Sequence, residues 1–391
     1  MTPAAGAPGL QAGTFTVFGG PLYRFGRRLG LVRGANTVPL GLSLGGALWL
    51  VLLLFALIEG LVDPLFSLSA IGVHVRLLVA LPLFFIGETL LAPCLATFFV
   101  TVVRAEVVPA SEMPAFRAAM GSMRRLADAW LPELLCLLGA VAMLLAGSHL
   151  PVHGATAALD PERVAIASTL TGQWYAVVCL TVVRFVLLRW LWWLFLWSVF
   201  LWRLSRLDLH LVPTHPDRQA GLGYLQAVHA QLMPTVGAIS AIQAAGLAEE
   251  VARGTMAFEA MAPAVVLLVA VAAALVLGPL VILAPRLRSA RLAGQELYME
   301  LGSRYVNAFE KKWLASGEDP GEPFLGTSDV GSLADLQTSF GAVEDMRWIP
   351  VSFRLTLLTL AAALLPMALL LLLKYPIDDL SRKLIERLLG A

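Results

Sequence analysis

The sequence predicts an all-α membrane protein, a polytopic bundle of about seven transmembrane helices with amphipathic cytoplasmic helices. Hydrophobic residues make up 58% of the 391 residues and charged residues only 14%, whereas soluble domains have about 45–50% and about 25%. The apolar residues are gathered into long runs, which is typical of helices that cross a lipid bilayer. The formal net charge of +1 argues against nucleic acid as a partner. We therefore expect the bilayer to be the main surrounding of this chain.

The first segment, residues 1–35, is predicted to be cytoplasmic and partly disordered. Its first 22 residues are rich in Gly, Ala and Pro and lack the charged-then-apolar order of an export signal. Basic residues concentrate on the cytoplasmic side of membrane proteins, and four of them precede the first apolar run: Arg24, Arg27, Arg28 and Arg33. This pattern predicts a cytoplasmic N-terminus.

Residues 36–285 are predicted to form the transmembrane bundle. A span needs about 20 apolar residues to cross a hydrocarbon core of about 30 Å. The fourth run would be about 50 Å long as one helix and must tilt strongly or project beyond the bilayer. A basic cytoplasmic connector, 104–129, is expected to contain an amphipathic helix. The predicted spans are 38–58, 77–103, 131–150, 174–206, 224–247 and 262–284.

Residues 224–247 decide whether the chain has six, seven or eight spans. This stretch is only moderately apolar and contains His229 and Pro234, so it fits a span, a re-entrant segment or an interfacial helix. If it did not span, eight basic residues between Arg286 and Arg354 would lie outside, against the positive-inside rule. We therefore predict seven spans.

The C-terminal third is predicted to contain a cytoplasmic helical region, 286–352, and a last span with an interfacial tail helix, 353–391. Apolar residues recur every fourth position from Leu297 to Trp313, which indicates one helical stripe. The last span is expected at 355–373. Seven spans place the basic tail outside, which agrees poorly with the positive-inside rule, so the side of the C-terminus stays open.

Three charged residues inside predicted spans are the main functional candidates: Glu88, Arg184 and Arg189. A charge near the bilayer centre costs at least a few kcal/mol and usually has a partner or faces water. An ion pair between Glu88 and one of the arginines fits their depths. Because five residues separate the arginines, they project about 140° apart on a helix and are not expected to share a partner. This set predicts either a site on a transport path or a buried pair that fixes helix register.

A motif loop at 203–223 supplies the second set of candidates, Thr214, His215, Asp217 and Arg218. Thr214 and Asp217 are favourable helix-capping types, which predicts a rigid turn that leads into a helix. In the alternative interpretation, His215 and Asp217 bind a metal or exchange protons at the membrane surface, with His210 and His229 as further ligands. The spacing matches no standard metal site, so we predict no metal and no cofactor.

The motif loop also carries a resemblance. The string Leu-Val-Pro-Thr-His-Pro-Asp-Arg-Gln-Ala-Gly-Leu-Gly, residues 211–223, resembles a group of uncharacterised bacterial multi-pass membrane proteins. The resemblance implies a bacterial inner-membrane protein and no activity. The His-Pro-Asp of J-domain co-chaperones joins two soluble helices, whereas here a tryptophan-rich span precedes it, so that match is rejected.

These observations predict a channel- or transporter-like protein that handles an ion or small solute through a charged intramembrane site. One alternative is a non-catalytic sensor or assembly factor, and another is a membrane-bound enzyme that uses His215 and Asp217. Other enzyme signatures, such as His-Glu-x-x-His or a phosphate-binding loop, are absent from the sequence, which favours a non-enzymatic protein. The three cysteines fall in apolar runs and predict neither disulfides nor a zinc site. A homo-oligomer is compatible with the sequence.

Overall fold

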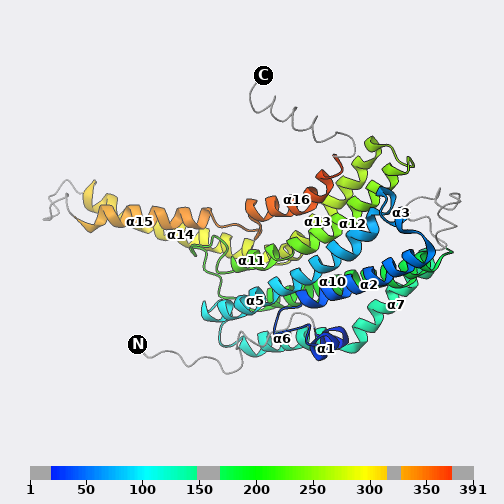
Figure 1. Cartoon of the computed structure of the whole chain (residues 1–391). Coiled ribbons are helices and arrows are strands. Elements are labelled where there is room, and N and C mark those ends of the chain that lie inside the picture. Colours follow the sequence, from blue (N-terminus) through cyan, green and yellow to red (C-terminus); the bar gives the residue numbers. More distant parts are fainter. Residues whose placement is uncertain (1–18, 148–167, 315–326, 372–391) are drawn as a thin grey trace, which may run out of the picture.

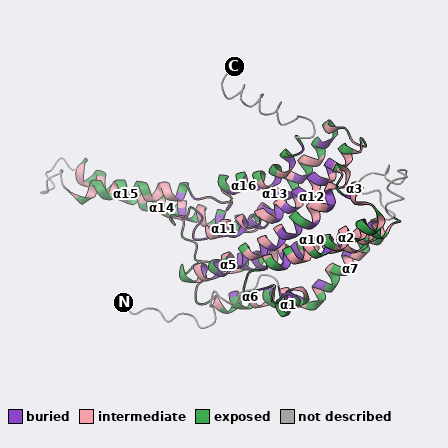
Figure 2. Cartoon of the chain, viewed as in Figure 1, coloured by how far each residue is buried: buried purple, intermediate pink, exposed green. Residues whose placement is uncertain are grey.

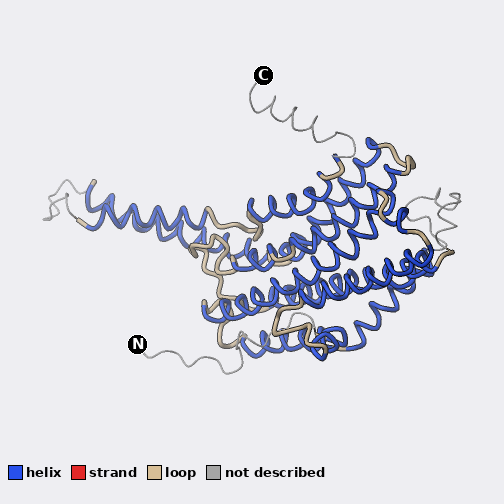
Figure 3. The backbone as a smooth tube through the Cα atoms, in the orientation of Figure 1, coloured by secondary structure: helices blue, strands red, loops and turns tan. Residues whose placement is uncertain are grey.

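The computed structural model describes residues 19–147, 168–314 and 327–371. Within these ranges the chain forms helices joined by turns and loops, without a β-strand (Figure 3). The all-α prediction is therefore confirmed for the described part of the chain. The predicted tail helix and the first 18 residues of the predicted N-terminal segment lie outside the described residues.

Long helices run side by side along a common direction and form the bundle (Figure 1). Among the neighbouring pairs, α2 packs against α5, and α12 packs against α16. The long helices of the bundle are α2 (Val38–Glu59), α5 (Leu81–Arg104), α7 (Trp130–Gly147), α10 (Leu180–Arg206), α12 (Met233–Ala252), α13 (Ala262–Val281) and α16 (Phe353–Ala368).

Shorter segments extend, cap or connect these helices. Two π-helical turns, in which the backbone bonds reach from i to i+5, continue directly into α5 and α10. They are η2 (Val75–Ala80) and η4 (Trp174–Cys179). The other segments are α1 (Gly20–Arg28), α3 (Val62–Leu65), η1 (Leu68–Ala70), α4 (Ile71–His74), α6 (Met113–Asp128), α9 (Leu170–Gln173), α11 (Tyr224–Ala230) and η5 (Phe258–Met261).

Four of the described helices are long and apolar enough to cross a membrane, and a fifth span results if α6 and α7, which meet at a bend of 50°, are taken together. The chain is thus a multi-pass membrane protein. α16 is apolar but shorter than these four, and α12 is not among them. The four spans are Val38–Glu59, Leu68–Arg104, Leu170–Arg206 and Phe258–Val281.

The outer surface of the bundle is apolar. Large side chains that point away from the neighbouring helices are well exposed, among them Leu50 and Leu54 on α2 and Leu267 on α13, and buried residues face inward (Figure 2). A soluble monomer rarely exposes contiguous apolar surface of this kind, whereas lipid tails accept it without cost. The exposure pattern agrees with the bilayer as the surrounding of the bundle.

The predicted amphipathic connector and cytoplasmic helices are both helical. α6 buries Phe116 and Met123 against the bundle and exposes its arginines. α14 (Ala284–Trp313) and α15 (Ser328–Glu344) pack against each other as a hairpin that extends beyond one end of the bundle (Figure 1). The Tyr305 hydroxyl donates to the Asp329 carbonyl at 2.9 Å and ties the two helices together.

Candidate functional site

A buried ion-pair network lies inside the bundle, with one arginine between two glutamates. The Arg189 Nη1 donates to Glu88 Oε1 at 2.8 Å, and the Arg189 Nε lies 3.2 Å from Glu133 Oε1. The exposed fraction of the side chain is 4% for Arg189, 3% for Glu88 and 10% for Glu133. We call Glu88, Arg189 and Glu133 the charged triad.

Three helices supply the triad. Glu88 lies in the first half of α5 and Arg189 in the first half of α10, whereas Glu133 belongs to the first turn of α7. The prediction from sequence included Glu88 and Arg189 and left Glu133 out of the site. An acidic residue four positions into an apolar run was the available signal, because such a residue needs a partner.

Glu133 also holds the start of α1. The backbone N–H of Leu22 donates to Glu133 Oε2 at 3.0 Å, so the carboxylate binds the positive end of that helix dipole. The contact is close enough that a side chain at Gly20 would place its Cβ 2.6 Å from the Glu133 carboxyl carbon, and Gly20 has a φ of +88°. Glycine is therefore required there for the helix to approach the carboxylate.

The start of α2 lies beside Glu88. Thr37, the residue before α2, donates from its hydroxyl to the Phe85 carbonyl at 3.0 Å and from its backbone N–H to the Thr89 hydroxyl at 3.0 Å. These two contacts bracket Glu88 on α5. The triad therefore lies part-way along α5 and α10, at the level of the first turns of α1, α2 and α7.

The triad contains more negative than positive groups. Two carboxyl groups share one guanidinium, and Glu88 Oε2 is buried without a hydrogen-bond partner in the described structure. An uncompensated charge of this kind is costly in a low-dielectric interior. Among the described contacts the triad thus carries one more carboxylate than guanidinium.

An aromatic ladder on α10 packs next to the triad. Trp193 stacks on Trp197 with ring centres 6.1 Å apart, and Trp197 stacks on Phe200 at 5.4 Å. Trp193, Trp197 and Phe200 are almost fully buried. The tryptophan cluster of the fourth predicted span thus packs the interior, while Trp202 is exposed with Arg206 over its ring.

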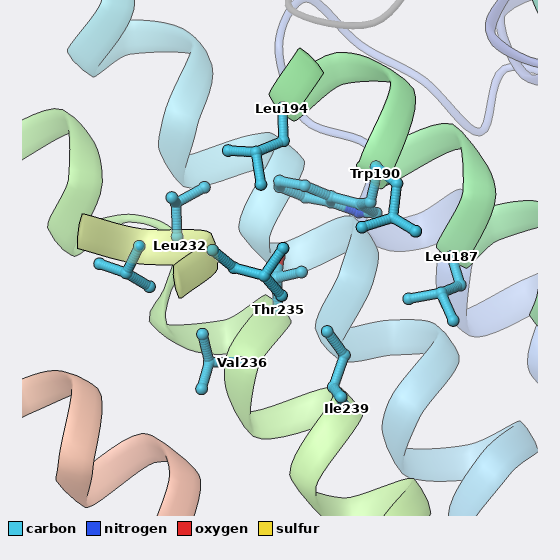
Figure 4. A pocket seen from close by; sticks show the side chains of 10 residues that line it. Leu187, Trp190, Leu194, Leu232, Thr235, Val236 and Ile239 are labelled. Atoms are coloured by element: carbon cyan, nitrogen blue, oxygen red, sulfur yellow. The ribbon is translucent and has the colours of Figure 1, made fainter. Parts of the chain in front are cut away.

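Two small cavities are lined in part by residues of α10. The first, of about 30 Å³, is apolar except for Thr235 and is lined by Trp190 and Leu194 of α10 and by Leu232 and Val236 (Figure 4). The second, of about 10 Å³, is bounded by Glu133, Arg189 and Trp193 at the bend between α6 and α7. One water needs roughly 10–15 Å³, so the second cavity approaches the size of a single water beside the triad.

Arg184 does not belong to the triad. Among the described residues it forms neither a hydrogen bond nor an ion pair, and its Nη1 atom is buried. It lies within electrostatic reach of Arg76 and Tyr175. Of the two arginines predicted as partners of Glu88, the structure places Arg189 there and directs Arg184 to a different part of the bundle.

Asp217 organises the motif loop. Its Oδ1 accepts the backbone N–H groups of Gln219 at 2.8 Å and Gly221 at 3.2 Å, and its Oδ2 accepts that of Gly223 at 2.8 Å. Gly223 directly precedes α11. The carboxylate therefore closes a turn that leads into the helix, as the sequence suggested, although it is not the N-cap of α11.

Of the remaining motif residues, His215 and Arg218 hold the loop in place. His215 Nδ1 lies 2.8 Å from Asp217 Oδ1, and the Arg218 carbonyl accepts the N–H of Arg347, which follows α15, at 2.8 Å. The exposed Arg218 side chain is 3.5 Å from Asp345. Thr214 forms no side-chain hydrogen bond with the described residues.

A metal site at the motif loop receives no support from the geometry. No group of three or more His, Cys, Asp or Glu side chains that could hold a metal is present among the described residues. His229, a candidate ligand, is fully buried; its Nε2 accepts from Trp197 Nε1 at 3.0 Å and its Nδ1 faces the Val276 carbonyl. Both ring nitrogens of His229 are thus engaged in packing α11 against α10 and α13.

Comparisons of the chain with protein-family models, with curated proteins and with solved structures give no match. The resemblance carried by the motif loop stays a prediction.

Proposed function

We propose that this chain is a channel- or transporter-like protein of a bacterial inner membrane, and that the charged triad is its proton-responsive gate. The observation that carries the proposal is the excess carboxylate of the triad, with a buried Glu88 oxygen that has no hydrogen-bond partner in the described structure. Buried intramembrane carboxylates commonly mark proton or ion paths in membrane proteins.

Three helices, α1, α2 and α7, begin at the level of the triad. Their first turns support a position of the triad near one face of the membrane. The apolar lengths of α2 and α7 extend from the triad in one direction only, because both helices begin beside it. α1 adds three arginines at this level, which suit a cytoplasmic interface. We propose a cytoplasmic N-terminus and seven crossings, by the seven long helices of the bundle.

The triad links the helices through charge. With both carboxylates ionised, Arg189 attracts α5 through Glu88 and α7 through Glu133, and Glu133 also holds α1. A proton on either carboxyl weakens one of these links. The small cavity against Glu133 and Arg189 gives a proton-carrying water a place beside the gate. We propose that protonation loosens α7 and α1 from α10 and opens the path.

The proposal is tested by flux through the purified protein in liposomes at several pH values, with an internal pH dye and a panel of ions and small solutes. We expect wild-type flux to rise as the pH falls, and the double variant E88Q/E133Q, which removes both carboxyl groups of the triad, to give flux that no longer depends on pH. E296Q, which changes an exposed glutamate on α14, is the matched control. Wild-type protein that passes nothing at any pH would contradict the proposal.

A second candidate function is that of an assembly factor or sensor. The α14–α15 hairpin extends beyond the bundle and exposes apolar side chains, among them Leu297 at 65% and Leu301 at 49%. Such exposure is typical of a surface that binds another protein. If this function holds, substitution of both leucines by serine abolishes association with that partner in cross-linked membranes. If the chain is a transporter, the same substitution leaves the flux unchanged.

A further inference from the structure

A basic surface lies where the chain enters its first span. Residues 19–36 contain no acidic residue and lie just before Val38, the first residue of a candidate span of 22 residues. A helix of that length is about 33 Å long and matches a hydrocarbon core of about 30 Å. The start of α2 therefore belongs at the edge of the hydrocarbon core, at the level of the lipid headgroups. The segment before it contains four arginines, Arg24, Arg27, Arg28 and Arg33.

This segment is held in place at both ends. The Leu22 N–H donates to Glu133 in the first turn of α7, and Thr37 donates to α5 through its hydroxyl and its backbone N–H. Between these contacts, the Tyr23 hydroxyl donates to the Gly34 carbonyl at 2.8 Å and holds the loop after α1 against that helix. The segment thus presents a fixed outer face at the start of the spans, and a ligand that binds there orders little backbone.

The outer face of α1 combines basic and apolar side chains. Arg24, Arg27 and Arg28 are exposed, and the exposed fractions of Phe25 and Leu29 are 58% and 56%. Phe25 and Leu29 are four residues apart and share one side of the helix. Each of them follows an arginine, so a basic side lies about 100° around the helix from the apolar side. A helix with two such sides lies in the membrane surface, with its apolar side toward the lipid tails and its basic side toward the headgroups.

The four arginines have no acidic partner within the described structure, where none of them forms an ion pair. Asp128, which lies against Gly19 at the start of α1, is already 3.9 Å from Arg124. Nearby, Trp130 begins α7 and is 61% exposed, and tryptophan is enriched at the membrane interface. The surface therefore offers unpaired positive charge at the level where lipids carry their phosphates.

We propose that the outer face of residues 20–36 binds the headgroup phosphates of anionic lipids. Clusters of arginine beside a membrane span attract anionic lipid, and a guanidinium presents paired N–H donors that match phosphate oxygens. The occupant is a lipid because the start of α2 places this surface at the headgroups and because Phe25 and Leu29 need an apolar surrounding. The inference does not depend on transport through the charged triad.

The binding test compares two lipids that differ only in the headgroup. The full chain in neutral detergent micelles is titrated with phosphatidylglycerol or with phosphatidylcholine of the same acyl chains, and retained lipid is counted by native mass spectrometry. We expect tighter binding of phosphatidylglycerol. R27Q/R28Q should reduce this preference by at least about tenfold, because each arginine near the surface adds to the attraction. R304Q/K311Q, which removes two exposed positive charges from α14, is the matched control and should keep the preference.

Hydrogen exchange locates the binding in the protein without substitutions. The amides of residues 22–29 should exchange at least about threefold more slowly in nanodiscs that contain phosphatidylglycerol than in nanodiscs of phosphatidylcholine alone, and the amides of α15 should not change. Equal affinity of the wild-type protein for both lipids, unchanged exchange in α1, or an equal loss of preference in R304Q/K311Q overturns the proposal. Equal affinity would leave an acidic protein surface as the partner of these arginines.

Discussion

Glu88 and Arg189 are joined by a 2.8 Å contact between Oε1 and Nη1, although 101 residues separate them in the chain. Glu133 approaches the same guanidinium from the other side. Arg184, five residues before Arg189 on the same helix, has no such partners within the described structure. Two arginines that look alike in the sequence therefore carry different energetic roles.

Removal of the two arginines should have opposite consequences for stability. We expect R189M to lower the free energy of unfolding by about 3–5 kcal/mol, because it leaves two buried carboxylates without a counter-charge. R184M should be neutral or stabilising, within about 1 kcal/mol, since it removes a charge that has no protein partner here. Denaturant unfolding in detergent micelles at neutral pH measures both. Equal losses of stability in R189M and R184M would show that the triad contributes no more to stability than Arg184 does.

A second substitution should rescue the first. In R189M, the Glu88 carboxylate is buried and uncompensated, so adding E88Q is expected to return at least about 1 kcal/mol of the lost stability, within the usual coupling of contacting residues. The same substitution in the wild-type protein should change stability less. The double-mutant cycle is measured by the same unfolding experiment, and E296Q added to R189M should return nothing.

The link between Glu133 and α1 predicts a local effect. E133A removes the acceptor of the Leu22 N–H, so α1 should detach more often and expose Arg27 and Arg28 to trypsin. We expect cleavage after these arginines to become faster by at least about fivefold, the equivalent of about 1 kcal/mol of local opening. The rate is followed by mass spectrometry, with E112A, at the residue before α6, as the control. An unchanged rate would mean that other contacts hold α1.

The motif loop should depend on Asp217 far more than on His215. D217A deprives three backbone N–H groups of their acceptor, and we expect it to lower stability by about 1–3 kcal/mol. H215A should cost less than about 1 kcal/mol, because the half-exposed imidazole adds one contact to the turn. D208A, at an exposed aspartate nearby, controls for lost charge. If H215A and D217A both abolish flux without loss of stability, the loop acts as a functional site.

The α14–α15 hairpin should open in acid. The hydrogen bonds that Lys312 and Trp313 donate hold the pKa of Asp329 below its ordinary value of 3.8. A lowered folded-state pKa stabilises the contact above the ordinary pKa and loses that stability as the pH falls through the folded value. The distance between spin labels at Asn307 and Ser332 should therefore lengthen below about pH 4.

Two variants check that acid opening starts at Asp329. D329N removes the titrating group and should leave the label distance independent of pH in this range. D335N, an exposed aspartate two turns along α15, should keep the pH dependence of the wild-type protein. Opening that persists in D329N would locate the titration elsewhere.

The sequence carried the class of fold and part of the site. Long apolar runs identified a helical membrane bundle, and the angle of about 140° between Arg184 and Arg189 correctly separated them onto different faces. The sequence alone could not predict that Arg189 rather than Arg184 pairs with Glu88, since the pairing depends on how α5 and α10 are rotated relative to each other. Glu133 was overlooked because its partner lies on another helix and its own position looked like the end of a span.

The motif loop was predictable in type and not in detail. Asp217 was expected to cap the following helix, and it accepts instead from three N–H groups of the turn, of which the last precedes α11. The turn folds back because Arg218, Ala220 and Gly221 adopt positive φ angles. Only glycine takes this conformation readily, so the positive φ angles of the arginine and the alanine could not be predicted from residue type.

The two π-helical turns set the rotational phase of the helices that follow them. A turn closed from i to i+5 holds one residue more than an α-helical turn, and each residue advances the helix face by about 100°. Glu88 follows η2 and Arg189 follows η4. Shortening Val75–Ala80 by a single residue would leave every apolar span intact by composition, yet it would swing Glu88 away from Arg189. The contact between Glu88 and Arg189 thus depends on the number of residues in the π-helical turns that precede them. An insertion or deletion in these turns would not be visible in a hydropathy profile.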